Sequence, residues 1–98
     1  MPPKYTHTDL NQGEILQGLL DAGYWAIDTH MVGCGYPDIT VIIPGAIVAL
    51  EVKQPGEKLR GKYEPGFHER AGAMYAPVFV VYTLEDALKR IGEVMRGR

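Results

Sequence analysis

The chain has 98 residues, of which 46% are hydrophobic and 22% charged, and this composition predicts one globular domain with no room for a second core. Its net charge of −2 excludes a protein held on nucleic acid by bulk electrostatic attraction alone. One cysteine, Cys34, excludes a disulfide scaffold, while short apolar runs and the lack of a leader predict a reducing, cytoplasmic location without membrane contact.

The N-terminal part is predicted to be an arm followed by a helix. Residues 1–8 have no hydrophobic periodicity and contain two prolines, so we expect a loose arm over residues 1–11. Asn11 and Glu14 have the spacing of a capping box, in which Asn11 caps the helix and Glu14 lies in its first turn. Apolar residues at helical spacing follow, and Gly23 is placed to end the helix. The expected helix covers residues 12–22.

Three strands are predicted next. Residues 24–27 and the β-branched residues 38–43 are typical of strands, and a glycine-rich loop lies between them. Pro44 and Gly45 suit the two central positions of a type II turn. We therefore expect residues 46–53 to return antiparallel to residues 38–43.

The second half predicts a helix, a strand and a final helix. Pro65 suits the first position of a helix that runs toward Met74. The continuous apolar run over residues 77–82 predicts a strand that is buried on both faces, and Thr83 is placed to cap the last helix. The order αβββαβα predicts an α/β fold in which helices flank a mixed four-stranded sheet.

The expected hairpin register brings two acids together. Counting outward from Pro44 and Gly45 places Asp38 opposite Glu51, and opposed side chains lie on one face about 4.5–5.5 Å apart at Cβ. Two carboxylates held there repel each other. Lys53 leaves the same face because it lies two residues beyond Glu51. Either both acids are exposed with Lys53 as a surface partner, or a divalent cation such as Mg²⁺ binds between them.

These motifs resemble those of a nuclease family. Gly-Tyr-Pro-Asp at residues 35–38, a strand–turn–strand, and Glu-Val-Lys at residues 51–53 are similar to the PD-(D/E)xK nuclease superfamily. The narrower resemblance is to the virus-type replication–repair nuclease (VRR-NUC) domain, and it covers roughly residues 12–92. This resemblance implies a restriction-endonuclease-like core.

The resemblance also implies a role for each matched residue. Asp38, Glu51 and the Val52 carbonyl are expected to hold Mg²⁺ or Mn²⁺, which polarises a phosphoryl oxygen and activates a water. Glu14 takes the place of the acidic residue on the family's first helix, although it also fits a plain capping box. Lys53 is expected either to orient or deprotonate the water or to offset charge in the transition state.

One position departs from the family pattern. The family usually carries a glutamine at the start of the second core helix, and Glu64 stands at that position. Glu64 either accepts from a water or binds the cation, or it is an ordinary N-terminal charge favoured by the helix dipole. His68 lies one turn later and is expected to pair with Glu64 on the helix.

Five residues are candidate nucleic-acid contacts: Lys58, Arg60, Lys62, His30 and Tyr36. The three cations either form a solvated loop or contact phosphates beside an anionic-substrate site. His30 is either structural or a phosphate contact. Tyr36 either packs in its turn or stacks on a base.

The resemblance therefore predicts a Mg²⁺-dependent DNA endonuclease, encoded by a phage or mobile element in a bacterial host. One domain offers one active site that cuts one strand at a time, so paired cuts in branched DNA such as a Holliday junction require a homodimer. The alternatives are a nuclease on flaps or non-specific duplex DNA, and a non-catalytic DNA-binding module.

Overall fold

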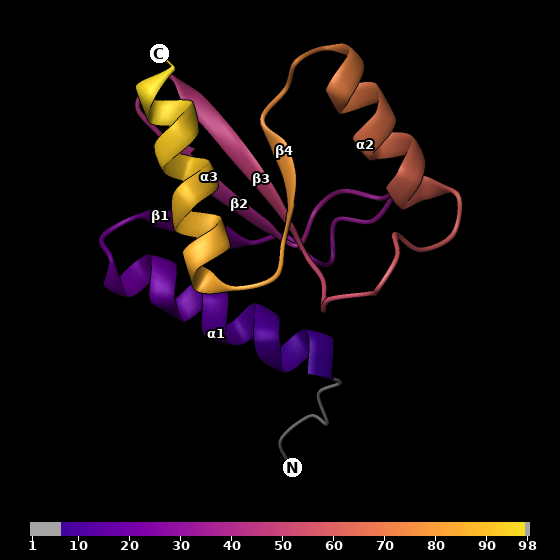
Figure 1. Ribbon diagram of the computed structural model, residues 1–98, viewed down its shortest axis with the longest axis horizontal. Helices are drawn as coiled ribbons and strands as arrows, with labels where there is room; N and C mark the ends of the chain where they lie inside the picture. The colour runs from indigo at the N-terminus through magenta and orange to yellow at the C-terminus, as the bar shows by residue number, and fades with distance from the viewer. Residues whose placement is uncertain (1–6, 98) are drawn as a thin grey trace.

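The computed structural model describes residues 7–97 of the chain. Its elements are α1 (His7–Asp21), β1 (Trp25–Asp28), β2 (Ile39–Ile43), β3 (Ala46–Val52), α2 (Tyr63–Ala73), β4 (Val78–Val81) and α3 (Leu84–Arg96) (Figure 1). This is the predicted αβββαβα order, so the α/β fold is confirmed. None of the described helices is both long and apolar enough to cross a membrane.

The four strands form one mixed sheet in the order β1-β2-β3-β4. β1, β2 and β3 form an antiparallel meander, whereas β4 is parallel to β3. Gly45 has a φ of 77°, which suits the second central position of the predicted type II turn between β2 and β3. The parallel pairing requires a crossover, and α2 supplies it. The mixed sheet is as predicted.

The hydrophobic core lies between one face of the sheet and the helices α1 and α3, which also contact each other (Figure 1). Alternate residues of β2 and β3 point to this face, where Ile39 pairs with Leu50 and Val41 with Val48. All four side chains are fully buried. The core also includes Ile15, Leu19, Val52, Val81, Ala87 and Ile91.

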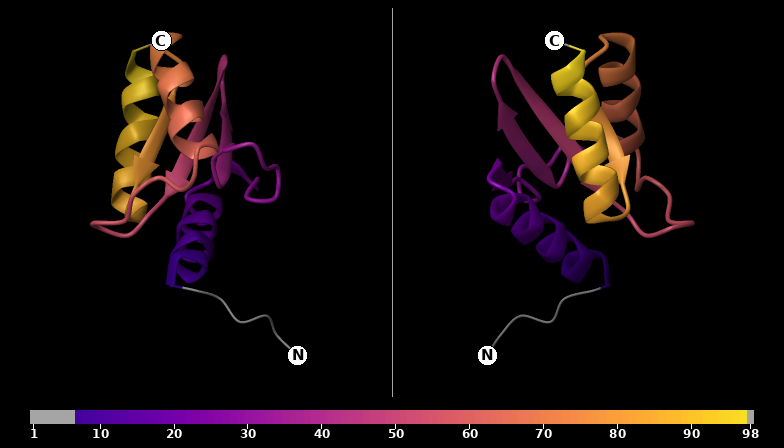
Figure 2. Two further views of the ribbon diagram at one scale, coloured as in Figure 1. Left: turned by 90° about the vertical axis from the view of Figure 1, so that its right-hand side faces the viewer. Right: turned by 60° about the vertical axis from the view of Figure 1, so that its left-hand side comes forward.

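The opposite face of the sheet is only partly covered. α2 packs beside β4 and covers the end of this face where β2 begins and β3 ends. At the other end, both views in Figure 2 show the β2–β3 hairpin without a described helix over it. The cross-strand row Trp25, Ile42 and Ile47 lies there, and Trp25 is 64% and Ile47 55% exposed.

The first helix begins earlier than the sequence predicts. α1 starts at His7 and not at residue 12, so residues 7–11 of the expected arm are helical, while residues 1–6 lie outside the described part. Asn11 is inside the helix, and its amide donates to the Tyr82 carbonyl at 3.0 Å across 71 positions. The capping-box prediction for Asn11 and Glu14 is therefore wrong, because a tertiary hydrogen bond uses the side chain that the local pattern assigned to a cap.

The ends of α2 and α3 agree with the sequence to different degrees. α2 begins at Tyr63, so Pro65 lies inside the first turn and not at its first position. A proline is tolerated there because the N–H groups of a first turn have no helical partners. The cap of α3 is confirmed, since Thr83 Oγ1 accepts from the Asp86 backbone N–H at 3.1 Å.

β4 is less buried than its continuous apolar run predicts. It is an edge strand, and Val78, Phe79 and Val80 are only half-buried. The predicted burial on both faces is wrong because a parallel strand is enclosed only when it has neighbours on both sides and helices on both faces.

Candidate functional site

Two acidic side chains meet where β2 begins and β3 ends. The ladder pairs Ile39 with Leu50, so the next residues outward are Asp38 and Glu51, as the predicted register requires. Asp38 Oδ2 accepts a hydrogen bond from the Val52 backbone N–H at 2.9 Å. The Glu51 carboxyl group lies close enough to that of Asp38 to raise its pKa, as expected for side chains on the same face of the sheet.

Ionisation of both acids at once is unfavourable. Burial, followed by the hydrogen bond and the negative charge of Glu51, raises the pKa of Asp38 to about 7. The Val52 N–H and the positive charge of Lys53 act in the opposite direction. A proton and a cation compete for such a pair, so cation binding is expected to release a proton.

Lys53 lies in the same cluster and is only 2% exposed. Its ammonium group is 3.0 Å from Glu64 Oε1, 3.9 Å from Glu51 Oε2 and 4.0 Å from Glu57 Oε2. A buried charge is unfavourable unless opposite charges and hydrogen bonds compensate for it. The three carboxylates supply this compensation, so Lys53 and Glu51 are not the exposed surface pair of the alternative interpretation.

Glu64 belongs to the cluster and is more than a charge at a helix end. Its Oε1 atom contacts Lys53 and also accepts from the Arg60 backbone N–H at 2.7 Å. It is the acidic residue of the first turn of α2, where the helix dipole favours a negative charge. Glu64 therefore anchors both the lysine and the loop that precedes α2.

One corner of the cluster has unmet hydrogen-bonding groups. His68 Nε2 lies 3.8 Å from Glu51 Oε1, and both atoms are buried without a hydrogen-bond partner. Unpaired buried polar atoms are rare in folded proteins. The predicted pairing of His68 with Glu64 is wrong, because the Glu64 carboxylate turns to Lys53.

The donors in this cluster fit a small divalent cation. Asp38 and Glu51 supply carboxylate oxygens, including the unpartnered Glu51 Oε1. Mg²⁺ is usually held by one or two carboxylates, with waters and substrate phosphates as the remaining ligands. Among the side chains of residues 11–97, no three His, Cys, Asp or Glu groups are arranged to hold a metal ion. The donor chemistry of the two carboxylates is that of an open magnesium-type centre.

Hydroxyl groups fix the segment that carries Asp38. The Thr29 backbone N–H donates to the Asp38 carbonyl at 2.8 Å, and Thr29 Oγ1 donates to the Pro37 carbonyl at 2.9 Å. The hydroxyls of Thr29 and Tyr36 contact Thr40 Oγ1 at 3.1 and 2.9 Å. The Tyr36 ring packs edge-on against Phe67, with centroids 5.3 Å apart. These contacts favour turn packing over base stacking for Tyr36.

Gln12, which is not among the predicted site residues, also holds this segment. Its side-chain amide is buried and donates to Asp28 Oδ1 at 2.9 Å and to the Asp38 carbonyl at 3.5 Å. The available signal was a polar residue on the apolar stripe of α1, one turn before Ile15. Such a residue needs a buried partner.

His30 lies in a small cluster next to α1. Asp28 Oδ1 accepts from the His30 backbone N–H at 3.1 Å and contacts His30 Nδ1 at 2.6 Å. Burial acts to raise the pKa of Asp28, but hydrogen bonds from His30 and Gln12 outweigh it and hold the pKa below the usual 3.8. The ring of His30 is thus turned to Asp28, which favours its structural interpretation.

Glu14 is not brought to the acidic cluster by the contacts of α1. It is exposed, and it lies two residues from the inward-facing Gln12, about 200° around the helix. No hydrogen bond or ion pair of the described residues joins Glu14 to Asp38 or Glu51. Its metal role stays a prediction, and so does that of the Val52 carbonyl.

The glycine-rich loop packs directly against α2. Gly35 has a φ of 81°, and a Cβ at this position would collide with the carbonyl of Tyr63. Only glycine combines this backbone conformation with such a close approach. The contact joins the loop that carries Asp38 to the helix turn that carries Glu64, as expected for a loop whose glycines permit close packing.

The predicted phosphate contacts lie on the loop between β3 and α2. Lys58, Arg60 and Lys62 are all exposed. Arg60 pairs with Glu57 Oε2 at 3.0 Å, and Lys62 lies over the Tyr63 ring at 5.3 Å from its centroid. Because Glu57 also approaches Lys53, the loop presents its cations beside the acidic cluster.

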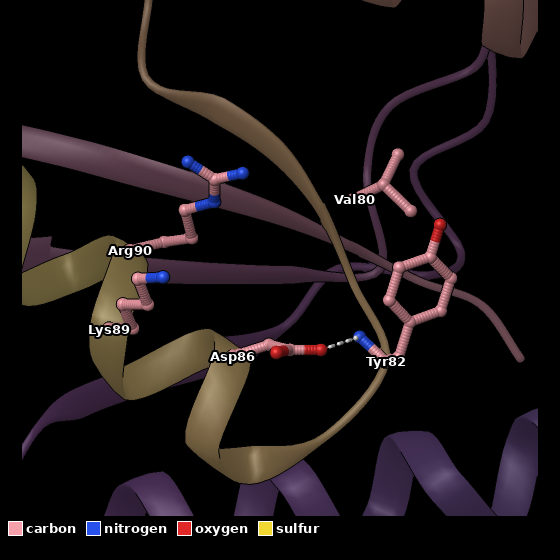
Figure 3. A pocket seen from close by; sticks show the side chains of 5 residues that line it. All are labelled: Val80, Tyr82, Asp86, Lys89 and Arg90. Atoms are coloured by element: carbon pink, nitrogen blue, oxygen red, sulfur yellow. Dashed lines mark hydrogen bonds between the residues drawn. The ribbon is translucent and has the colours of Figure 1, made fainter. Parts of the chain in front are cut away.

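A separate pocket with charged side chains lies between β4 and α3. It is lined by Val80, Tyr82, Asp86, Lys89 and Arg90. Figure 3 shows the side chains of Lys89 and Arg90 extending from α3. One turn earlier on this helix, Asp86 Oδ2 accepts a hydrogen bond from the Tyr82 backbone N–H at 3.0 Å. None of the predicted site residues lines this pocket.

No protein-family model matches this chain, and no curated protein matches it in sequence. The resemblance to the VRR-NUC domain therefore rests on the residues of the two motifs and on the order of the elements.

Proposed function

We propose that the protein is a metal-dependent endonuclease that hydrolyses DNA phosphodiesters, of the VRR-NUC type. One observation carries the proposal: Asp38 and Glu51 contact each other in a buried corner beside the ammonium group of Lys53. Burying two acids against each other is unfavourable for stability alone. A site that binds a cation and a phosphate makes use of this arrangement.

Each residue of the cluster has a distinct part in the proposed reaction. Asp38, Glu51 and the Val52 carbonyl would hold Mg²⁺ or Mn²⁺, which supplies a Lewis acid and lowers the pKa of a bound water. Lys53 presents positive charge next to the reacting phosphate, and its ion pairs with three carboxylates favour this electrostatic role over that of a base. Glu64 keeps the lysine in place.

The basic residues around the cluster would position the DNA backbone. Lys58, Arg60 and Lys62 lie on the neighbouring loop, and contacts of this kind fix a duplex without reading its sequence. Lys89 and Arg90 offer a second patch at the edge of β4. A local cationic surface of this kind is compatible with the net charge of −2.

The proposed substrate is branched DNA, and the proposed assembly is a homodimer. One site of this kind cuts one strand, so two related copies are needed for paired cuts. The open apolar row of Trp25, Ile42 and Ile47 offers a surface for the second copy, because exposed apolar patches commonly mark interaction sites.

The test is cleavage of labelled four-way junctions and of linear duplexes with the same sequence, in Mg²⁺ and in chelator. We expect Mg²⁺-dependent cutting of the junction in preference to the duplex. Asp38→Asn and Glu51→Gln should each abolish it, while the surface change Glu69→Gln should leave it intact. Equal cutting of both substrates would remove the branched-DNA claim.

Two outcomes would support the other classes of function. Preferential cutting of flaps would point to a different nuclease substrate. DNA binding without any cutting, and without a rise in melting temperature on addition of Mg²⁺ or Mn²⁺, would point to a non-catalytic binding module. A cation that binds only the folded state must raise the melting temperature.

A further inference from the structure

We propose that His68 is a positioning residue for Glu51, with its Nε2–H group donating to Glu51 Oε1 and thereby orienting the carboxylate toward the cation. This inference rests on the proposed function, because it takes Glu51 to be a cation ligand. It concerns a residue of α2 that lies outside the Pro-Asp and Glu-x-Lys motifs.

Two buried atoms, one on His68 and one on Glu51, lack hydrogen-bond partners. His68 Nε2 and Glu51 Oε1 are 3.8 Å apart, and they are the buried side-chain atoms of the described residues that have no hydrogen-bond partner. The side chain of Glu51 is 3% exposed and that of His68 14%, so solvent does not readily satisfy either one. Each is therefore placed to serve as partner of the other.

The strand β3 and the helix α2 hold the Glu51 and His68 side chains opposite each other. Glu51 is fixed in the sheet, where β3 pairs with β4. On α2, the Phe67 ring next to His68 packs on Tyr36 at 5.3 Å and lies 6.4 Å from the His68 ring. The glycine loop also touches the start of α2. A movement of about 1 Å brings Nε2 and Oε1 to an ordinary hydrogen-bond length.

His68 is placed to support a cation ligand and not to be one itself. Among the described side chains, no group of three His, Cys, Asp or Glu is arranged to hold a metal ion, and Asp38 and His68 each face Glu51. An ionised carboxylate can only accept hydrogen bonds, so Nε2 must carry the proton. Donors of this kind orient ligating carboxylates, and their loss typically weakens metal binding about 10–100-fold.

The experiment measures cation affinity in the full-length protein by calorimetric titration with Mn²⁺ and Mg²⁺. The variants are His68→Phe, which keeps a ring without a donor, and His68→Gln, whose amide can replace Nε2–H. We expect His68→Phe to weaken Mn²⁺ binding roughly 10–100-fold and His68→Gln to restore most of it. Glu69→Gln, an exposed change on the same helix, is the matched control and should bind like the unchanged protein.

A second measurement does not depend on the fold tolerating a substitution. Long-range ¹H–¹⁵N correlation spectra of the unchanged protein report which nitrogen of His68 carries hydrogen. A protonated Nε2 is expected with the cation bound, and the Nδ1–H tautomer with a bare Nε2 would overturn the inference. Unchanged Mn²⁺ affinity in folded His68→Phe would overturn it as well.

The outcomes separate this inference from the function on which it rests. If the unchanged protein binds neither Mn²⁺ nor Mg²⁺, or if Asp38→Asn and Glu51→Gln bind as it does, the proposed metal site itself fails. If these two variants lose binding while His68→Phe keeps it, the metal site stands and only the role of His68 is wrong.

Discussion

Asp38 is the residue whose chemistry depends most on its surroundings. Its carboxyl group receives one backbone N–H from Val52 but faces the carboxyl group of Glu51 in a buried corner. Burial and the neighbouring acid outweigh the favourable N–H and the charge of Lys53, so the pKa rises to about 7. The residue that the motif marks as a ligand is thus protonated over much of the acidic range when no cation is present.

The raised pKa predicts a falling stability of the cation-free protein between about pH 4 and pH 7. Below pH 4 the carboxyl is protonated in both states. From the unfolded pKa of about 3.8 up to the folded pKa of about 7, only the unfolded state has released the proton, so rising pH favours unfolding. Above pH 7 the Asp38 carboxyl group is ionised in both the folded and the unfolded state, so the free energy of unfolding falls no further on its account.

Urea unfolding at pH 5 and pH 8 in chelator measures this loss, with Asp38→Asn as the comparison. Because asparagine does not titrate, we expect the variant to lose less stability than the unchanged protein between the two pH values. Addition of Mg²⁺ at pH 8 should raise the stability of the unchanged protein only. Parallel pH profiles for the two proteins would contradict the raised pKa.

Among the elements, the hairpin of β2 and β3 follows from sequence because its determinants are local. The Pro44–Gly45 turn sets the register, and the register places Asp38 opposite Glu51. The start of α1 could not be found in the same way, because Asn11 bonds to a carbonyl 71 positions away. A capping pattern and a tertiary contact use the same side-chain chemistry, and sequence alone does not distinguish them.

The partners of Lys53 and His68 also depend on tertiary structure. Lys53 was correctly predicted to share the face of Glu51, since strand alternation fixes this. Its contacts with Glu57 and Glu64, and the approach of His68 to Glu51, depend on where α2 packs against the sheet. No spacing rule gives this position, because the loop between β3 and α2 has no regular structure.

The contact between the glycine loop and α2 predicts a strong effect of Gly35→Ala. The added Cβ would collide with the Tyr63 carbonyl, and the backbone φ of 81° is unfavourable for alanine. We expect a loss of about 2 kcal/mol or more in the free energy of unfolding and weaker Mn²⁺ binding, because the loop carries Asp38.

Gly56→Ala is the matched control for this prediction. Gly56 has a similar φ of 86°, but nothing lies within 4 Å of its added Cβ. Gly56→Ala therefore has the unfavourable positive φ of Gly35→Ala but no steric clash of the added Cβ with another residue. Equal losses in the two variants, measured by urea unfolding and Mn²⁺ titration, would show that the loop–helix contact does not matter.

At the scale of the whole molecule, the sheet is covered unequally. One face is buried by α1 and α3, while α2 covers only the end of the other face that carries the acids. The remaining row contains Trp25 and Ile47, which are 64% and 55% exposed. This uncovered end lies on the same face as the site, so a partner bound there would border the proposed DNA path.

The proposed homodimer predicts that Trp25→Lys weakens self-association by at least about tenfold, because a charge replaces the largest apolar side chain of the row. Sedimentation velocity over a concentration series measures the change. Tyr75→Lys is the control, since Tyr75 is 95% exposed but lies in the turn after α2. A protein that is monomeric throughout the series, or equal effects of both variants, would contradict this assembly.

The hydrogen bond between Asn11 and the Tyr82 carbonyl has a consequence for biosynthesis. α1 is synthesised well before the carbonyl that receives Asn11 and the helix α3 that packs on α1. Gln12, the next residue, donates to the Asp38 carbonyl, so its position depends on where α1 docks. We therefore expect the contacts of α1 with the Asp38 segment to become stable only after α3 has been synthesised.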